Sequence, residues 1–276
     1  MKHLSFFPVV FVAGLMVGLS GAEVCFAQTP IVADGGVVNG ASFVKGAVSP
    51  GSLVSIFGTG LVSKVASADT IPLSSTLSGV TVTFADLPPA PLLSVIPGAP
   101  GSQDQINAQV PWDIGSGSGV VNVMVTTANG TSAPIAVNFA PSMPGIFIAA
   151  LGGQLNAVAV NFSDGSLAWP QSLVPGSHPA KAGDTLVIYA TGLGAVDHQP
   201  IEGGIPSLLA NTIAKPKILI GGVAGNVEFS GLSPQFVGVN QLNVQVPTGV
   251  KAGSAVPLQI EVNGFTSTNQ AVIAIQ

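Results

Sequence analysis

The 276-residue chain contains no arginine and very few charged residues of any kind. Only 7% of its residues are charged and its formal net charge is -5, whereas an average soluble domain has roughly 25% charged residues. Nucleic-acid binding requires a basic stripe that displaces counterions from phosphates. The composition therefore excludes nucleic acid as a partner. The lack of arginine also excludes the planar guanidinium fork that clamps phosphate or carboxylate groups.

Cysteine is almost absent as well, because Cys25 is the single one. It lies in a segment typical of a secretory signal peptide, with Lys2 at the start, an apolar stretch over 4–22 and small residues before a cut after Ala27. We predict a signal peptide over 1–27, although the apolar run is also long enough for an uncleaved anchor. The mature chain would contain no thiol, which excludes disulfides and thiolate chemistry.

Long amphipathic helical stretches are also missing, whereas turn-forming residues are abundant, with Gly 35 and Pro 22. Short stretches alternate between apolar and polar residues with a period of two, as half-buried strands do. In residues 241–247, Leu242 and Val244 alternate with Asn243 and Gln245. Many short strands separated by Gly/Pro turns indicate an all-β sandwich or barrel.

Two blocks of sequence occur twice in the same order. Residues 50–61 resemble residues 182–193, and the Gln-x-Asn-x-Gln-Val-Pro strand at 105–111 returns at 241–247. The offsets are nearly equal, at 183 − 51 = 132 and 241 − 105 = 136. A duplication of this kind predicts two domains built alike.

The duplication leads to a prediction of domain organisation. After the signal peptide we expect a short leader over 28–34, one β-sandwich over 35–140 and a second over 141–276. Both strands 53–57 and 186–190 are mainly apolar on both faces, as buried central strands are. Asn-Gly pairs at 129–130 and 263–264 predict hairpin turns. The join at 140–145 contains two prolines, which predicts a fixed relation between the domains.

Each repeat resembles an Ig-like sandwich of the IPT/TIG kind, in which a Gly turn precedes an apolar strand that ends in Gly-x-Gly. The chain also resembles the uncharacterised acidobacterial (Solibacter-type) C-terminal domain family over nearly all of residues 37–276. The runs that carry this second resemblance are 37–43, 50–61, 144–147, 189–194, 229–234 and the two Gln-x-Asn-x-Gln-Val-Pro strands. The resemblance implies an Ig-like fold and an exported protein, and it supplies no catalytic residues.

Catalysis or metal binding would require titratable groups that converge. Asp197 and His198 are the one adjacent pair, and with Asp164 and His178 they could form a metal site or a proton relay. Their spacing matches no metal motif, so we interpret them as surface loop residues. Calcium requires six to eight oxygen ligands, and the chain has no Asp-x-Asp-x-Asp run. The sequence thus predicts no cofactor, no metal and no enzyme.

The two tryptophans offer a different kind of site. An exposed aromatic ring can stack on a sugar, so Trp169 and Trp112 are candidate glycan contacts, together with His178 in the same loop as Trp169. The alternative is that Trp112 packs at a sandwich edge and Trp169 packs over the domain junction. The outward amides Asn107, Gln109, Asn243 and Gln245 could bind hydroxyl groups, although a solvated sheet face also explains them.

These observations predict an exported, non-catalytic module, extracellular or periplasmic, with no membrane span after signal cleavage. Its function would be binding or adhesion at the cell envelope, to a neutral glycan or to an envelope protein. The alternatives are a structural spacer or protein–protein contact module and, remotely, an enzyme with an unrecognised site. The sequence makes no prediction of the oligomeric state.

Overall fold

The computed structural model describes residues 28–268 and 270–276. The predicted signal peptide, with Cys25, lies outside these residues. Within them the elements are strands, apart from one short 3-10 helix, η1 (Trp112–Ile114). None of the helices in this part of the chain is long and apolar enough to cross a membrane. The predicted all-β fold class is confirmed.

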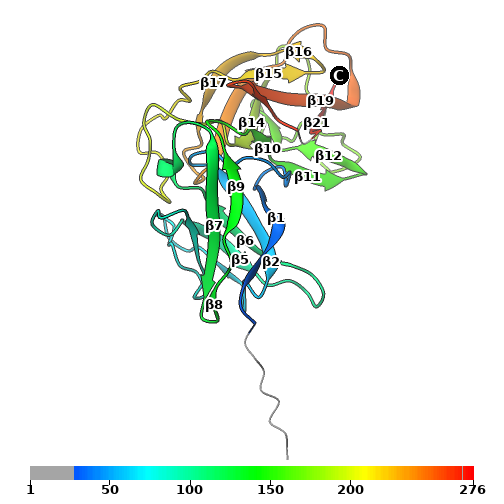
Figure 1. Ribbon diagram of the computed structural model, residues 1–276. Helices are drawn as coiled ribbons and strands as arrows, with labels where there is room; N and C mark the ends of the chain where they lie inside the picture. The colour runs from blue at the N-terminus through cyan, green and yellow to red at the C-terminus, as the bar shows by residue number, and fades with distance from the viewer. Residues whose placement is uncertain (1–27, 269) are drawn as a thin grey trace, which may run out of the picture.

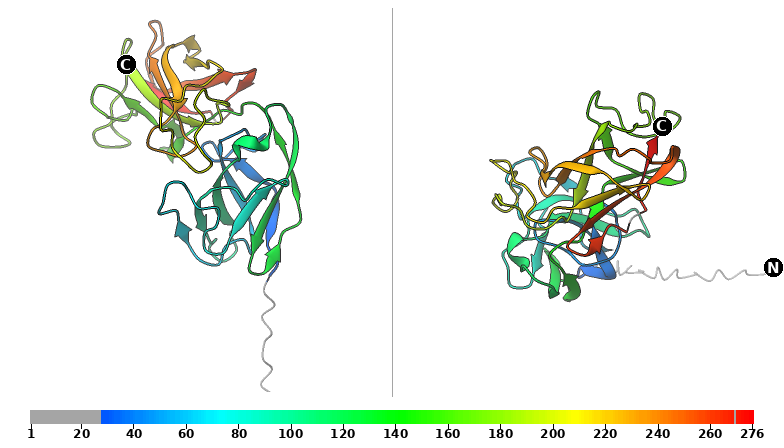
Figure 2. Two further views of the ribbon diagram at one scale, coloured as in Figure 1. Left: turned by 90° about the vertical axis from the view of Figure 1, so that its left-hand side faces the viewer. Right: turned by 90° about the horizontal axis from the view of Figure 1, so that it is seen from above.

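Antiparallel sheets form two β-sandwiches, consistent with tandem Ig-like domains. The N-terminal sandwich, blue to green in Figure 1, lies below the C-terminal one, and the side view in Figure 2 shows the same end-to-end arrangement. Each sandwich has its own core of buried aliphatic side chains, the first around Ile56 and Phe84 and the second around Ile188 and Ile260. The two cores lie on either side of Pro141, where the sequence predicted the join.

In the first sandwich, one sheet has the order β1-β2-β6-β5-β3 and faces a smaller sheet of β4, β7, β8 and β9. The larger sheet comprises β1 (Ile31–Asn39), β2 (Leu53–Thr59), β6 (Asp104–Gln109), β5 (Leu92–Ile96) and β3 (Ala66–Ser67). The smaller sheet comprises β4 (Thr81–Phe84), β7 (Gly119–Thr127), β8 (Gly130–Thr131) and β9 (Ile135–Phe139).

In the second sandwich, one sheet has the order β10-β14-β18-β17, with β13 also paired to β14. Its strands are β10 (Gly145–Ile146), β13 (Ala159–Asn161), β14 (Thr185–Thr191), β17 (Asn226–Leu232) and β18 (Asn240–Gln245). The opposite sheet comprises β11 (Ile148–Leu151), β12 (Gln154–Ala157), β15 (Lys217–Ile220), β16 (Val223–Ala224), β19 (Gly253–Val262), β20 (Phe265–Thr266) and β21 (Val272–Ile275).

The duplicated sequence blocks supply two strands of the same three-stranded unit in both sandwiches. β6 lies between β2 and β5 just as β18 lies between β14 and β17. Even the irregularities match, because β5 has a bulge between Leu92 and Ser94, and β17 has one between Val227 and Phe229. The two polar strands therefore occupy equivalent positions, and residues opposite them can be compared one by one.

The hairpin predicted at 263–264 is present between β19 and β20. Asn263 and Gly264 have φ values of 50 and 80 degrees, so both adopt the left-handed conformation that a tight hairpin needs. The hairpin at 129–130 joins β7 and β8, and Gly130 there has a φ of 117 degrees. Strands β2 and β14 are central in their sheets and mostly buried, as predicted.

The linker between the sandwiches is hydrogen-bonded to both of them. The Met143 N–H donates to the Gly192 carbonyl of the second sandwich at 2.8 Å, and the Asn39 amide of the first donates to the Met143 carbonyl at 3.1 Å. A second contact comes from the loop after β14, whose Gly203 N–H donates to the side-chain carbonyl of Gln109 at 2.9 Å. The junction is thus held by specific contacts as well as by the stiffness of the linker.

Candidate functional site

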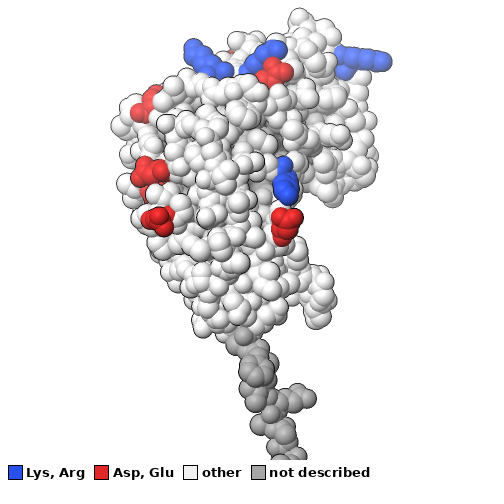
Figure 3. Space-filling view, viewed as in Figure 1, with Lys and Arg blue, Asp and Glu red and all other residues white. Residues whose placement is uncertain are grey.

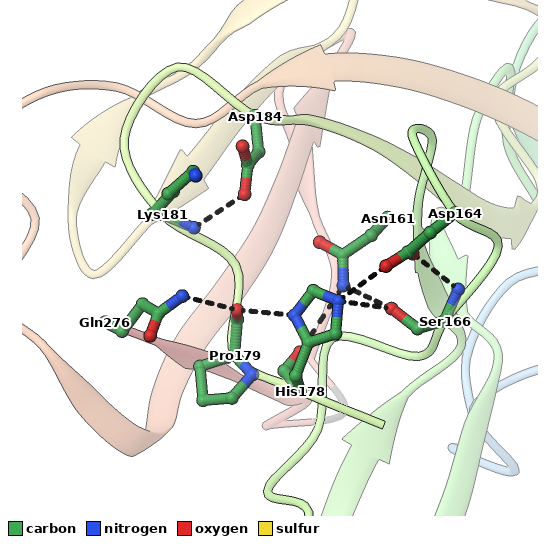
Figure 4. A network of polar contacts seen from close by, with 8 residues as sticks. All are labelled: Asn161, Asp164, Ser166, His178, Pro179, Lys181, Asp184 and Gln276. Carbon is green, nitrogen blue, oxygen red and sulfur yellow. Dashed lines mark hydrogen bonds and ion pairs between the residues drawn. The ribbon is translucent and has the colours of Figure 1, made fainter. Parts of the chain in front are cut away.

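Of the four residues considered together in the sequence, Asp164 and His178 contact each other, in a small polar network near the C-terminus (Figure 4). His178 Nε2 lies 2.8 Å from Asp164 Oδ2 and 2.9 Å from Ser166 Oγ. The other ring nitrogen, Nδ1, faces the Pro179 carbonyl at 3.0 Å. A Ser-His-Asp relay requires the serine and the carboxylate on opposite ring nitrogens. Here both lie at the same nitrogen, so the arrangement differs from that relay.

The second histidine lies in a separate group. His198 Nδ1 is 3.1 Å from Asp197 Oδ1, and Asp197 also accepts from the backbone and side-chain amides of Asn211. No hydrogen bond or ion pair joins this group to His178 within residues 28–268 and 270–276. In the same residues, no three His, Cys, Asp or Glu side chains gather closely enough to hold a metal ion.

The Asp164–His178 contact has a consequence that can be measured. The Asp164 carboxylate raises the pKa of His178 above its ordinary 6.5, and its hydrogen bond to His178 lowers the pKa of Asp164 from 3.8 to about 2. The raised histidine pKa stabilises the folded state below pH 6.5. This stabilisation is lost as the pH rises through the pKa that His178 has in the folded protein. The lowered aspartate pKa stabilises the folded state above pH 3.8, and this is lost as the pH falls towards 2.

We therefore expect the His178 ring to titrate above pH 6.5 in an NMR titration of the folded protein, and Asp164→Asn to bring that midpoint down. Asp197→Asn is the matched control, because Asp197 contacts His198 and not His178. An unchanged His178 midpoint in Asp164→Asn would show that the two side chains do not interact in solution.

The expectation that a tryptophan forms an exposed aromatic platform is wrong. Trp169 is 5% exposed and Trp112 is 6% exposed. The Trp169 indole N–H donates to the Ala157 carbonyl at 2.6 Å, so this ring anchors its loop to β12. Trp112 packs between the sandwiches. Both rings are buried because a loop or a neighbouring domain covers them, which strand periodicity does not reveal. His178, in contrast, keeps a half-exposed side chain.

The interpretation of the outward amides as one solvated face is wrong for Gln109. This side chain is fully buried at the domain junction, where it contacts Gly51 and Gly203. Gln245 is exposed, as expected. Asn243, together with Gln241 of the same strand, lines a groove of about 490 Å³ on the outer face of the β14-β18-β17 sheet.

This groove is the most site-like feature of the described residues. Its polar floor is made by Gln241 and Asn243, and its apolar walls include Phe229 of β17 and the loop residues Leu208 and Leu209. The two leucines are 64% and 65% exposed, which is unusual for adjacent large apolar residues. The volume lies within the roughly 300–1,000 Å³ of ligand sites, and an apolar lining with a few polar groups is typical of them. No residue that lines the groove is charged.

Sequence reasoning identified Asn243 of this groove but missed Gln241 and the walls. Leu208 and Leu209 belong to a loop, and only their adjacency could have singled them out. A second hollow of about 500 Å³ lies between the sandwiches, where Ile71 of the first faces Phe236 of the second. Its lining is mainly apolar, with Asp69, Thr70 and Gln235 as the polar residues. The face in Figure 3 carries only scattered charges with broad uncharged areas between them.

No family model matches the sequence, and no curated protein matches it either. Solved structures show distant likeness to Ig-like tandem domains. The Yersinia pseudotuberculosis adhesin InvE shares 12% identity at a TM-score of 0.21, with 86% of this chain and 58% of that chain covered. The titin Ig tandem domains A164-A165 share 10% identity at a TM-score of 0.19, with 83% and 91% covered. The chain thus spans 58% of the length of the adhesin structure. Likeness at this level bears on neither activity nor ligand.

Proposed function

We propose that the protein is an exported, non-catalytic module that binds a neutral partner at the cell envelope. The observation that carries this proposal is the uncharged groove on the second sandwich, where exposed Leu208 and Leu209 stand beside the amides of Gln241 and Asn243. Exposed apolar side chains beside a few polar groups are typical of a surface that a partner covers.

Two further features support the proposal. The resemblance to the acidobacterial (Solibacter-type) domain family, which is found in exported proteins, agrees with the signal peptide predicted over 1–27. The arrangement at His178 also favours a non-catalytic function, because Asp164 and Ser166 share one ring nitrogen. An exported chain without cysteine after residue 25 would rely on its cores and on the domain junction for stability.

A structural spacer, or a protein–protein contact module, is the alternative function. The hydrogen bonds of Asn39 and Gln109 across the junction favour it, because they would keep the two sandwiches at a constant distance and orientation. A spacer alone, however, gives no reason for two exposed leucines beside a groove.

The test is a co-sedimentation measurement on the chain from residue 28 onward. The probes are insoluble cellulose, chitin, xylan and peptidoglycan sacculi, together with an isolated bacterial envelope fraction. We expect saturable binding to at least one probe and its loss in Leu208→Ser/Leu209→Ser. Val120→Ser is the matched control, since Val120 is equally exposed but lies on β7 of the first sandwich. Failure to bind every probe, or equal binding by the double variant, would contradict a function centred on this groove.

A further inference from the structure

The two repeats differ at the residues that flank the polar strand, and the difference frees an amide. In the first sandwich, Ser55 of β2 and Ser94 of β5 lie opposite Asn107. In the second, the residues opposite Asn243 are Val187 of β14 and Phe229 of β17. The sheet pairing is the same, but two hydroxyl groups have been replaced by apolar side chains.

In the first sandwich the amide of Asn107 is hydrogen-bonded through both its oxygen and its nitrogen. Its oxygen accepts from Ser55 Oγ at 2.7 Å and from Gln105 Nε2 at 2.8 Å, and its Nδ2 donates to Ser94 Oγ at 2.8 Å. Gln105 Oε1 accepts no hydrogen bond within the described residues, but the nitrogen of Asn107 has a serine partner. This network stabilises the outer face of the sheet.

In the second sandwich the corresponding side-chain amides have fewer hydrogen-bond partners. Gln241 Nε2 still donates to Asn243 Oδ1 at 3.0 Å. Within the described residues, the Asn243 Nδ2 group donates no hydrogen bond and the Gln241 Oε1 atom accepts none. One unused donor and one unused acceptor therefore stand side by side on the floor of the groove.

A further difference places an aromatic ring beside these amides. β17 has Gly231 opposite Gln241, where β5 has Ile96 opposite Gln105. The Phe229 ring tip lies 2.6 Å from the position that a Cβ of Gly231 would occupy. The absence of a side chain at Gly231 thus lets the ring lie along the strand, next to the amide pair.

We infer that the groove of the second sandwich recognises a neutral sugar ring, with Phe229 against its apolar face and Asn243 and Gln241 bonded to its hydroxyl groups. This inference rests on the proposed function and specifies its ligand. A hydroxyl group both donates and accepts, so adjacent hydroxyls match one free donor beside one free acceptor. An uncharged lining suits an uncharged ligand. An extended peptide is disfavoured because β18 is paired on both edges and residues 210–212 already pair with the outer edge of β17.

The experiment follows the side-chain amide signals of the labelled protein by NMR during titration with cellohexaose, chitohexaose, xylohexaose and laminarihexaose. A charged hexagalacturonate serves as the comparator. We expect at least one neutral sugar to shift the Asn243 and Gln241 signals and to leave those of Asn107 and Gln105 unchanged. No shift with any neutral sugar, or shifts with the charged sugar alone, would overturn the inference.

The decisive variant is Val187→Ser/Phe229→Ser, which restores the hydroxyl groups found in the first sandwich. We expect it to bind at least tenfold more weakly. Asn243→Ala removes the free donor without altering the apolar wall. It tests the sugar assignment if the double variant does not fold. Unchanged sugar affinity in the folded variants would refute the assignment. If the protein binds an envelope fraction through Leu208 and Leu209 but binds no hexasaccharide, the sugar assignment is refuted and the proposed function still holds.

Discussion

Trp112→Ala is expected to lower the free energy of unfolding by about 3–5 kcal/mol, as truncation of a buried tryptophan generally does. Trp112 belongs to the first sandwich but packs with Val196, Ala210 and Leu232 of the second. Its ring fills the space over Gly51, where a Cβ would lie 2.2 Å from the ring. Removal of the ring would leave a cavity between the domains that neither core can close.

The measurement is urea denaturation followed by circular dichroism and by fluorescence. In Trp112→Ala the only tryptophan left is Trp169, which is buried in the second sandwich, so fluorescence reports that sandwich alone. We expect the two transitions to separate because the junction no longer couples the domains.

Trp112→Phe is the matched control. It keeps an aromatic ring and removes an indole N–H that is buried without a hydrogen-bond partner among the described residues. We expect it to lose far less stability than the alanine variant. If Trp112→Ala unfolds at the same urea concentration as the unmodified protein, the ring does not stabilise the junction.

Thr191→Val is the second substitution with a large expected effect. Thr191 Oγ1 accepts from the Leu53 N–H of the first sandwich at 2.9 Å and donates to the Gly238 carbonyl of the second at 2.7 Å. Valine has nearly the same shape but no hydroxyl, so both backbone groups would stay buried and unpaired. Each such group costs roughly 1–3 kcal/mol, which predicts a loss of at least about 2 kcal/mol in urea denaturation.

The repeat supplies the control for this prediction. Thr59 is the residue of the first sandwich that corresponds to Thr191, and its side chain is exposed. Thr59→Val should change the free energy of unfolding by less than about 0.5 kcal/mol, as is usual on a surface. Equal effects of the two substitutions would mean that the bridging hydroxyl contributes nothing at the junction.

Much of the fold could be predicted because it depends on local pattern. Period-two alternation marks strands 105–111 and 241–247, and Asn-Gly pairs mark the hairpins at 129–130 and 263–264. These features act over a few residues, so they can be recognised without knowledge of the neighbours in space. The duplication then extends each local prediction to its counterpart in the other repeat.

The candidate site was harder to predict because its parts come from distant segments. The amide of Asn243 stood out in the sequence, but Leu208 and Leu209 come from a loop that is hydrogen-bonded across the domain junction through Gly203. The two tryptophans misled for the same reason, since the elements that bury them lie elsewhere in the chain. Alternation tells which side of a strand a residue is on, and it does not tell what covers that side.

The amino-acid sequence by itself determined the all-β class and the repetition of one strand unit. It also determined the low charge of the chain, and each of these properties follows from composition or short-range pattern. The tertiary structure alone decided that Trp112 and Gln109 serve the junction rather than a ligand. It also decided that the amide nitrogen of Asn107 has a serine partner, whereas that of Asn243 has none among the described residues. The physical reason is that a hydrogen bond or a packed ring depends on the neighbour across the sheet or the domain boundary, and chain folding alone brings that neighbour into place.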